Sequence, residues 1–498
     1  MSVYINEFFQ TPLDATLSSR RRCVLYSRSS ACSTILASKK ILMRKPYLFI
    51  VMALLTGCAS YQPQPLAPLK MMAAYEERSL TKPELQRFIT ASLPKTTSAW
   101  GLSKLTLAAY YYSPELDAVR AKLTRGEAAT ETANQRPNPS LSLPLQYADQ
   151  PIKPWTYGLA LDIPIETAGK RGYRVAQAQQ LSDAARLNIG QTAWQIRSRL
   201  RSALLDLYAA TQHHSIIERQ VDIQQNIVTM LERQLLLGSA SRFELSQEQI
   251  ILERDRSDLA NNEKLMLDAK ALIAQTIGIP LRALEPIKIN LSDFESLTPQ
   301  IPDNAARRQT VLNRTDILGA LAEYDASQTA LQLEVARQYP NLSLGLGYSF
   351  DQGVNKYSVT PAGITLPLFN RNEGPIAEAE AHRKEAATHV EALQDQAINQ
   401  TDSALQHFHL ATQNLVLIDT QGATRTAAFQ ADQRSFDLGA IDRLALSRSR
   451  RAVNVDAMTH VDAVVQVQQA ITQLENAIQQ PLDGIPLHAQ STETVIRK

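Results

Sequence analysis

The eight histidines and three cysteines are the side chains of this sequence that could bind a metal ion or act as nucleophiles. His382 and His389 are seven residues apart and could share one helix face, whereas His407 and His409 could not. No histidine has an adjacent acidic or cysteine residue at the spacing of a known metal site. The sequence also contains no glycine-rich phosphate loop, nucleophile elbow or zinc-protease helix. It therefore predicts no metal site, no cofactor and no enzyme.

Charge and hydropathy exclude two further classes of protein. The 498 residues carry 51 Lys and Arg against 49 Asp and Glu, and this net charge of +2 is too small for a nucleic-acid binder that relies on bulk charge. No apolar run reaches the roughly 18 to 20 residues of a membrane-spanning helix, so a polytopic helical membrane protein is excluded. Membrane β-strands leave a weaker trace in composition, and this criterion does not test for them.

Residues 43–57 have the build of an export signal, with two basic residues before an apolar stretch too short for a stable membrane anchor. The segment ends in Leu-Thr-Gly before Cys58, which resembles the lipobox of bacterial lipoproteins. The resemblance implies that Cys58 is acylated, and a generic signal peptide is the alternative. Ala59 follows the cysteine, and the absence of Asp at this position resembles lipoproteins sorted to the outer membrane. We expect Met43 to be the true start, so that residues 1–42 are a mis-assigned extension. The alternative is that residues 1–42 are a cytoplasmic extension of the protein.

The second half of the chain repeats the first, and this repeat indicates the architecture. Segments recur in the same order at offsets of 203 or 201 residues. The matching segments are 136–143 with 339–346, 161–165 with 364–368, and 238–246 with 439–447. We interpret the exported chain as an internal tandem duplication. Each copy is predicted to contain a helix, two strands, a long helix, a turn and a shorter helix.

Each copy contains one very long predicted helix. From Lys170 to Leu237 no proline interrupts the chain, and apolar residues recur at alternating spacings of three and four, which is a coiled-coil period. Only His214 and Gln224 break this seam. At 1.5 Å per residue the segment predicts a rod of about 100 Å. Residues 372–438 have nearly the same length and a weaker seam that is richer in alanine.

Four segments alternate between apolar residues and small or polar residues. In 341–350 the leucines and aromatic residues share one face, and the Asn, Ser and Gly residues share the other. The same alternation is found in 141–147, in 157–165 and around 362–368. It is typical of transmembrane barrel strands, and soluble hairpins that cover a core are the alternative. Because four strands cannot close a barrel and open edges in lipid leave backbone groups unpaired, the barrel interpretation requires several copies of the chain.

These features together resemble the TolC-type outer-membrane efflux factors. The resemblance rests on two tandem copies, each with two strands and a long helical hairpin, and on the similar turns at 238–246 and 439–447. It implies a mixed α/β membrane protein, a homotrimer whose twelve-stranded outer-membrane β-barrel takes four strands from each chain. A long α-helical coiled-coil tube would continue the barrel through the periplasm. The partners implied are a periplasmic membrane-fusion adaptor and an inner-membrane resistance–nodulation–division pump.

Two segments resemble the cobalt–zinc–cadmium branch of this family. They are 163–171, which contains Pro-Ile-Glu and Gly-Lys-Arg, and 366–372. Ala168 departs from the branch by replacing the first glycine of its usual pair. The resemblance implies a passive exit duct for heavy-metal cations, and multidrug efflux through the same architecture is one alternative. A lipid-tethered periplasmic coiled-coil scaffold without a pore is the other.

The prediction divides the chain into seven parts. They are the upstream extension 1–42, the lipoprotein signal 43–57, a lipidated linker 58–98, the first efflux repeat 99–277, an equatorial connecting segment 278–304, the second repeat 305–480 and a C-terminal tail 481–498. We expect the protein in the outer membrane, anchored by lipid and by the barrel, and extending into the periplasm. Outer-membrane lipid is therefore an expected partner, and nucleic acid is not.

Three candidate functional residues lie at the predicted strand ends. Pro164 and Pro367 occupy equivalent positions, where proline is tolerated because it cannot donate to a strand ladder. We interpret them as rigid corners between barrel and tube, and simple strand terminators are the alternative. Asp162 lies on the face predicted to line the lumen, where it could bias passing ions or remain a solvated carboxylate.

The tips of the two predicted helical hairpins have clear capping signals. Gly238 and Gly439 each follow a leucine at the end of a long helix, which is the usual place for a C-cap. Ser241 and Asp442 are then placed to cap the returning helices. An ordinary helix turn needs no more than this, and the family resemblance adds that the tips face the adaptor and close the tube.

Four arginines near the tips are candidates for tip contacts or for a gate. Arg242 and Arg443 lie at the turns and could contact the adaptor, with a solvated role as the alternative. Arg448 and Arg451 lie near one helix face, in a stretch where some relatives have an acidic constriction. Arginines that face a lumen would repel cations unless they are paired. We therefore predict Arg448 and Arg451 as a possible gate, with a surface salt bridge as the alternative.

Overall fold

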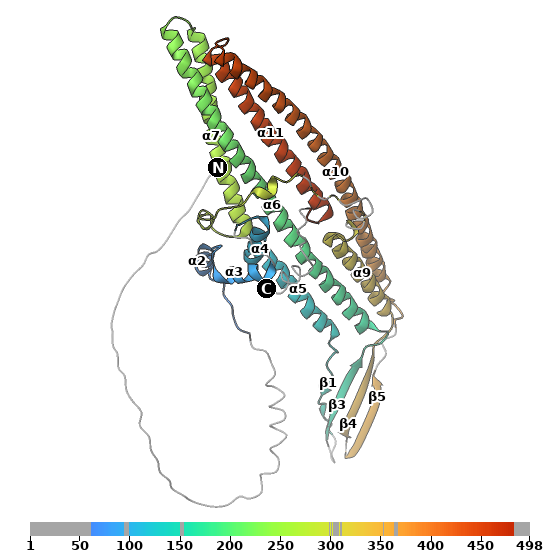
Figure 1. Ribbon diagram of the computed structural model, residues 1–498. Helices are drawn as coiled ribbons and strands as arrows, with labels where there is room; N and C mark the ends of the chain where they lie inside the picture. Colours follow the sequence, from blue (N-terminus) through green and yellow to red (C-terminus); the bar gives the residue numbers. More distant parts are fainter. Residues whose placement is uncertain are drawn as a thin grey trace, which may run out of the picture. The chain divides into compact units, whose positions relative to one another are not determined.

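The computed structural model describes residues 61–93, 99–149, 154–297, 299, 301, 308, 311–351, 353–362 and 367–482, without the side chains of residues 361 and 362. The predicted export signal and Cys58 lie outside the described residues. The chain divides into two units, Met1–Ala67 and Pro68–Lys498, and the second contains all the elements discussed below (Figure 1). None of the helices described is both long and apolar enough to cross a membrane.

The elements of the second unit follow one another in the same order twice. The N-terminal helices are α2 (Pro68–Glu76), α3 (Pro83–Ser92) and α4 (Leu102–Tyr112). The first half then contains α5 (Pro114–Asn134), β1 (Ser140–Ser142), β2 (Leu145–Tyr147), β3 (Trp155–Ile165), α6 (Lys170–Leu236) and α7 (Arg242–Ile277). After the short 3-10 helices η1 (Leu281–Ala283) and η2 (Ser292–Phe294), the second half contains α9 (Thr315–Ala336), β4 (Leu342–Asp351), β5 (Val354–Ala362), α10 (Glu373–Asp437) and α11 (Arg443–Ile478).

The two long helices start in the same way. Gly169 precedes α6 with φ of 72°, and Asn372 precedes α10 with φ of 61°, so both lie in the left-handed region. Asparagine is one of the few residues besides glycine that adopts this conformation readily. The two residues are 203 positions apart, which is the offset of the sequence repeat. The equivalent backbone bend therefore survives although the residue type differs.

The strands form one antiparallel sheet in the order β1–β3–β4–β5, and β2 also pairs with β3. The first predicted strand is divided into β1 and β2 around Pro144, which has no N–H to donate to a ladder. The fourth strand begins at Val354, earlier than the predicted range of 362–368. Of that range, 363–366 lie outside the described residues. The pairing of β3 with β4 joins the two halves of the chain.

Two rows of helices extend from the sheet (Figure 1). Beside the sheet, α5, α6, α9 and α10 are neighbours in that order. Farther along, α6 pairs with α7 and α10 pairs with α11, and α11 packs against α6. The tips of both hairpins lie at the end of this unit opposite the sheet (Figure 1). The long helices thus connect the sheet to the tips without interruption.

The largest buried cluster lies where α3, α4, α6, α7 and α11 meet the connecting segment. Phe294 of that segment is 1% exposed, and the guanidinium of Arg201 lies 5.4 Å from the centre of its ring. Its carbonyl accepts a hydrogen bond of 2.8 Å from Nε2 of Gln468 on α11. Arg197 and Glu475 add a buried ion pair of 2.9 Å between α6 and α11. These contacts fasten the connecting segment to both hairpins.

Candidate channel surfaces

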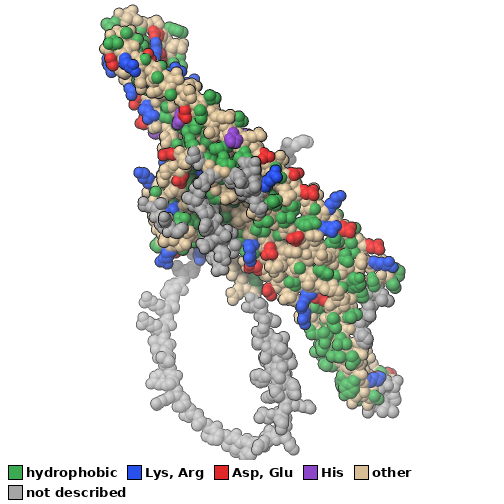
Figure 2. Space-filling view, turned by 45° about the vertical axis from the view of Figure 1, so that its right-hand side comes forward, with side chains coloured by type: hydrophobic (Ala, Val, Ile, Leu, Met, Phe, Trp, Pro, Cys, Tyr) green, Lys and Arg blue, Asp and Glu red, His purple; other side chains and the backbone are tan. Residues whose placement is uncertain are grey.

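One face of the sheet is apolar, and no other part of the chain that the structure describes covers it. The register places apolar residues opposite one another across all four ladders, as in Leu161 opposite Leu346 and Tyr348 opposite Tyr357. Tyr357 is 81% exposed. Figure 2 shows the hydrophobic side chains gathered over this end of the unit. Further exposed members of this apolar face are Leu141, Leu145, Tyr147, Trp155, Tyr157, Leu159, Ile165, Leu342, Leu344 and Val359.

The opposite face of the sheet consists of small and polar residues, and close packing requires the glycine at position 158. A Cβ added to Gly158 would lie 2.6 Å from the carbonyl oxygen of Tyr348, which is a backbone atom. No side chain fits at position 158 unless the strands move apart. A Cβ on Gly347 would lie 2.5 Å from the hydroxyl of Ser358, which can rotate away.

Asp162 lies on this polar face, as predicted from the alternation. It pairs with Ser140 on one side and with Gly345 on the other. Its Oδ1 is buried and has no hydrogen-bond partner among the residues described. A buried carboxylate oxygen without a partner is unfavourable, so this oxygen requires a hydrogen-bond donor that the described residues do not supply.

The first predicted corner lies at the end of β3. Pro164 is beyond the last β1–β3 residue pair, Ser140 with Asp162, so its missing N–H breaks no bond to β1. Four residues later the backbone turns sharply through Ala168, with φ of 56°, and Gly169. An alanine in the left-handed region is strained by its Cβ, and this is the position where the sequence departs from the Gly-Gly pair of the branch that it resembles.

The charged residues of the 163–171 segment and the next turn of α6 hold the corner together. Lys170 is buried, and its Nζ donates hydrogen bonds of 2.5 Å to the carbonyl of Tyr339 and 2.6 Å to Oδ1 of Asn341. Arg174 donates to both carboxylate oxygens of Glu166, at 2.7 and 3.2 Å. These hydrogen bonds hold the pKa of Glu166 below its usual value, whereas burial lowers the pKa of Lys170. The segment that resembles the cobalt–zinc–cadmium branch therefore has a structural role at this corner.

The second predicted corner, Pro367, lies beside the first. It lines a groove of about 610 Å³ together with Glu166, Lys170, Tyr339 and Asn372. Asn372 closes this side by donating from Nδ2 to the carbonyl and to Oε2 of Glu334, at 2.7 and 2.9 Å. The structure therefore brings both prolines to the same end of the sheet.

Both hairpin tips have the predicted caps. Gly238 and Gly439 have φ of 74° and 76°, and the residue after each donates to a carbonyl five positions earlier, as in a Schellman motif. The hydroxyl of Ser241 accepts from the N–H of Glu244 at 3.0 Å. Asp442 accepts in the same way from the backbone N–H three residues later, at 2.8 Å. Each tip is therefore a tight turn with capped helices on both sides.

The tips expose apolar side chains that sequence reasoning did not select. Leu237 is 83% exposed and Leu438 is 85% exposed, beside the exposed Phe243. Arg242 and Arg443, the predicted tip residues, are also exposed at the first turns of α7 and α11. A signal was available, because leucines at the very end of a coiled-coil seam have no partner helix to cover them.

The two predicted gate arginines reach from α11 to the other hairpin. Arg451 donates to Asp255 at 2.5 and 3.1 Å, and Asp255 is almost fully buried. Arg448 donates to Glu244 at 3.0 Å and to Glu248 at 2.9 Å and is more exposed. Both arginines lie on one face of α11, as predicted, and both are paired. We call the set of Arg448, Arg451, Glu244, Glu248 and Asp255 the hairpin latch.

The polar break in the seam of α6 belongs to this latch. Gln224 is fully buried, and its Nε2 donates to Oε2 of Glu248 at 2.7 Å. Its Oε1 accepts from Arg451 at 2.8 Å. The residue that looked like a defect of the coiled coil therefore links α6, α7 and α11.

Two of the histidines acquire acidic partners through tertiary contacts. Nε2 of His213 lies 2.9 Å from Oδ1 of Asp462, and Nε2 of His460 lies 3.1 Å from Oδ1 of Asp419. These partners come from other helices, so sequence spacing could not reveal them. In the part of the chain that the structure describes, no group of three or more His, Cys, Asp or Glu residues is placed to hold a metal ion.

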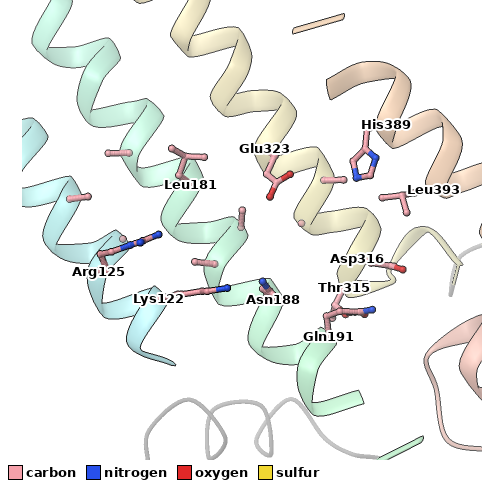
Figure 3. A pocket seen from close by; sticks show the side chains of 17 residues that line it. Lys122, Arg125, Leu181, Asn188, Gln191, Thr315, Asp316, Glu323, His389 and Leu393 are labelled. Atoms are coloured by element: carbon pink, nitrogen blue, oxygen red, sulfur yellow. Dashed lines mark hydrogen bonds between the residues drawn. The ribbon is translucent and has the colours of Figure 1, made fainter. Parts of the chain in front are cut away.

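A second groove, of about 560 Å³, lies across α5, α6, α9 and α10 (Figure 3). Lys122 and Arg125 reach it from α5, whereas Glu323 comes from α9 and His389 from α10. Seven of the residues that line it are alanine or glycine. These small residues allow the helices to approach closely, and the groove carries charges of both signs.

We compared the chain with families of known proteins. The family model described as outer membrane efflux protein matches residues 108–279 and 306–479, one match in each half. The chain is 21% identical to the cobalt-zinc-cadmium resistance protein CzcC of Cupriavidus metallidurans, over 73% of this chain and 86% of that protein. It is 22% identical to the pyoverdine export outer membrane protein OpmQ of Pseudomonas putida, over 68% and 71%.

The fold comparison agrees with the family match. The outer membrane protein VceC of Vibrio cholerae superposes with a TM-score of 0.63 at 18% identity, over 76% of this chain and 96% of that one. The resemblance stated from the sequence is thereby confirmed, and the family is one of efflux proteins of the outer membrane, not of enzymes. The chain belongs to the outer membrane efflux protein family.

Proposed function

We propose that this chain is the outer-membrane channel of a tripartite efflux system, a passive exit duct formed by a homotrimer. The observation that carries the proposal is the sheet, with its exposed apolar face, its small and polar face and its two open edges. Such a sheet is stable in lipid only when its edges are paired. The β1/β2 edge of one copy and the β5 edge of another can pair, and three tandemly duplicated chains supply the twelve strands of a closed barrel.

The helical part supports closure into a tube. In the farther row of helices, α7 and α10 are the outer members. Both expose apolar side chains: Ile250 and Leu265 on α7, and Leu410 and Leu417 on α10. Because α7 and α10 are the two uncovered helices of the row, their exposed apolar residues favour packing of α7 against α10 of a neighbouring copy.

The hairpin latch offers a mechanism for opening. Its ion pairs join α11 to α7 and exist only while the two hairpins lie together. A periplasmic adaptor that binds the exposed tips, through Leu237, Leu438 and the neighbouring Arg242 and Arg443, would separate the hairpins and break the latch. The channel then opens like an iris and releases substrate driven by an inner-membrane resistance–nodulation–division pump.

Heavy-metal cations are our proposed cargo, and the relation to CzcC supports this. The relation to OpmQ supports an organic cargo instead, since that protein is named for pyoverdine export. Multidrug efflux is the corresponding alternative for this chain. Asp162, with an unpartnered oxygen on the polar face, is the residue that we propose to interact with passing ions.

Export and lipid attachment complete the proposal. Acylation of Cys58 after removal of residues 43–57 would anchor the chain in the outer membrane. Metabolic labelling with a radioactive fatty acid tests this, because Cys58→Ala should abolish the label. Label that persists in the Cys58→Ala chain contradicts it.

The channel itself is tested by purified protein in planar bilayers and on gels. We expect discrete ion conductance, and oligomers that resist detergent but dissociate on heating. A lipid-tethered scaffold without a pore, the second candidate, gives no conductance. Absence of both conductance and oligomers would reject the channel.

Cargo is tested by growth of a deletion strain on zinc, cobalt, cadmium, copper and silver, and on dyes, detergents and antibiotics. Sensitivity to metals alone, rescued by the intact gene, supports the metal assignment. Sensitivity to drugs alone would reject it and leave the channel in place.

A further inference from the structure

The chain makes one of two equivalent junctions internally. At the start of α6, Lys170 donates to the carbonyl of Tyr339 and to Oδ1 of Asn341, in the turn between α9 and β4. Next to it, the hydroxyl of Thr167 donates to the carbonyl of Pro340 at 2.5 Å. The corner of the first half is thereby tied to the turn of the second half.

The repeat identifies the residues of the other junction. At the offset of 203, Lys170 corresponds to Glu373 at the start of α10. Tyr339, in the turn between α9 and β4, corresponds to Arg136 in the turn between α5 and β1. The proline and asparagine that follow Tyr339 also follow Arg136.

These counterparts lie at opposite edges of the chain and cannot meet within it. The sheet order places β1 at one edge and β5 at the other. The helices beside the sheet have the matching order, with α5 at one end of the row and α10 at the other. Arg136 follows α5, and Glu373 begins α10, so each residue belongs to a different free edge.

We propose that Glu373 of one copy forms an ion pair with Arg136 of the neighbouring copy, at a junction that repeats the Lys170 junction between chains. The inference rests on the proposed function, because it requires the chains to form a closed ring. A head-to-tail contact that repeats an internal contact is heterologous, and such contacts close into rings when the rotation allows it.

The chemistry of the two junctions is complementary. On the helix side, Glu373 has a charge opposite to that of its counterpart Lys170. On the turn side, Arg136 has a positive charge where its counterpart Tyr339 is neutral. Arginine and carboxylate form paired hydrogen bonds with good geometry. The following Asn138 can present its amide N–H to Glu373, where Asn341 presents its oxygen to Lys170.

Both residues are free to form this contact in the single chain. The side chains of Arg136 and Glu373 are exposed. Neither has an ion-pair partner among the residues whose placement is described. Several other exposed charges of this region, such as Arg337 with Glu334, are already paired within the chain.

Cross-linking between two differently tagged chains tests the contact directly. One chain carries Arg136→Cys and the other Glu373→Cys, and the two are co-expressed and oxidised. We expect a reducible dimer that contains both tags, well above the background of the wild-type chain and of either variant alone. As a matched control, Asp117→Cys replaces Arg136→Cys, because Asp117 is exposed about 25 Å away along α5 and should give no such dimer.

A charge exchange provides an independent measurement. Arg136→Glu and Glu373→Arg each place like charges at every junction, so the temperature at which the oligomer dissociates should fall by several degrees. The double variant restores the pair with reversed polarity and should recover most of that loss. The proposal is overturned if the dissociation temperature of the double variant falls by the sum of the two falls measured for the single variants.

The outcomes separate this inference from the proposed function. Oligomers that form normally, with no two-tag dimer, refute the Glu373–Arg136 pair and leave the channel intact. If amine cross-linking and gels detect no oligomer even in the wild type, the ring itself fails and the pair fails with it.

Discussion

Removal of Arg451 from the hairpin latch should both destabilise the protein and open the channel. In the Arg451→Met variant, Asp255 would keep only the 2.9 Å hydrogen bond from Gln220 and would lose both bonds from Arg451. Asp255 is 3% exposed and Arg451 is 21% exposed. Breaking a fully buried pair costs about 3–5 kcal/mol, and the partial exposure of Arg451 reduces our figure to about 2 kcal/mol.

The same free energy shifts the equilibrium between the closed channel, in which the hairpins lie together, and the open channel. The latch joins α11 to α7, so its loss favours separation of the hairpins by about 30-fold at 2 kcal/mol. We expect a higher open probability of single channels in planar bilayers, without any change in their fully open conductance. In parallel, the purified variant should unfold at lower temperature.

Two further variants make the argument refutable. Arg448→Met, on the same helix face, breaks a more exposed contact and should cost only about 0.2–1 kcal/mol. In Asp255→Asn with Arg451→Met, no charge of this pair remains buried, so both the stability and the open probability should return toward the wild-type values. An unchanged open probability in Arg451→Met, or equal effects of Arg448→Met and Arg451→Met, would refute the reasoning.

Three other predictions concern the corner and the sheet. Ala168→Gly should raise the free energy of unfolding by about 1 kcal/mol, measured by thermal denaturation, because it removes the strain at φ of 56°. Gly158→Ala should reduce the yield of heat-labile oligomer on gels, because its Cβ would lie 2.6 Å from the carbonyl oxygen of Tyr348. The lowered pKa of Glu166, caused by its hydrogen bonds from Arg174, means that this pair stabilises the fold above the usual carboxylate pKa and is lost as pH falls through the lowered value. Glu166→Gln should therefore flatten the loss of thermal stability on acidification below about pH 4.

Each of these predictions has a clear control or contrary result. Gly172→Ala, on α6 at a site with open space around the glycine, should leave the oligomer yield unchanged. A less stable Ala168→Gly variant would show that the left-handed alanine is not strained. Acid sensitivity that is identical with and without Glu166 would exclude the corner ion pair as its source.

Much of the fold could be predicted because its signals are local. The apolar seam of α6, the alternation in the strands and the capping residues at Gly238 and Gly439 depend on spacing within a few turns of chain. The β5 boundary and the division of the first strand at Pro144 were missed. Strand ends depend on which residues of the neighbouring strand remain available for pairing, and that is not a local property.

The roles of charged residues were much harder to predict. Lys170 and Glu166 were interpreted as marks of a metal-efflux branch, and the structure adds that both stabilise the corner. Gln224 was noted only as a break in the seam, although it links three helices. The partners of Lys170 and Gln224 lie on other elements, so no spacing along the chain could reveal them.

The sequence alone determined the repeat, the long helices, the two-faced strands and the capped tips, because each results from backbone geometry and from side chains that are close along the chain. Tertiary structure alone decided which charges far apart in the chain meet. Asp255 binds Arg451, which is 196 positions away in the chain. Lys170 binds Asn341, which is 171 positions away. An ion pair depends on distances of a few ångströms between side chains, and only the packing of the helices sets those distances.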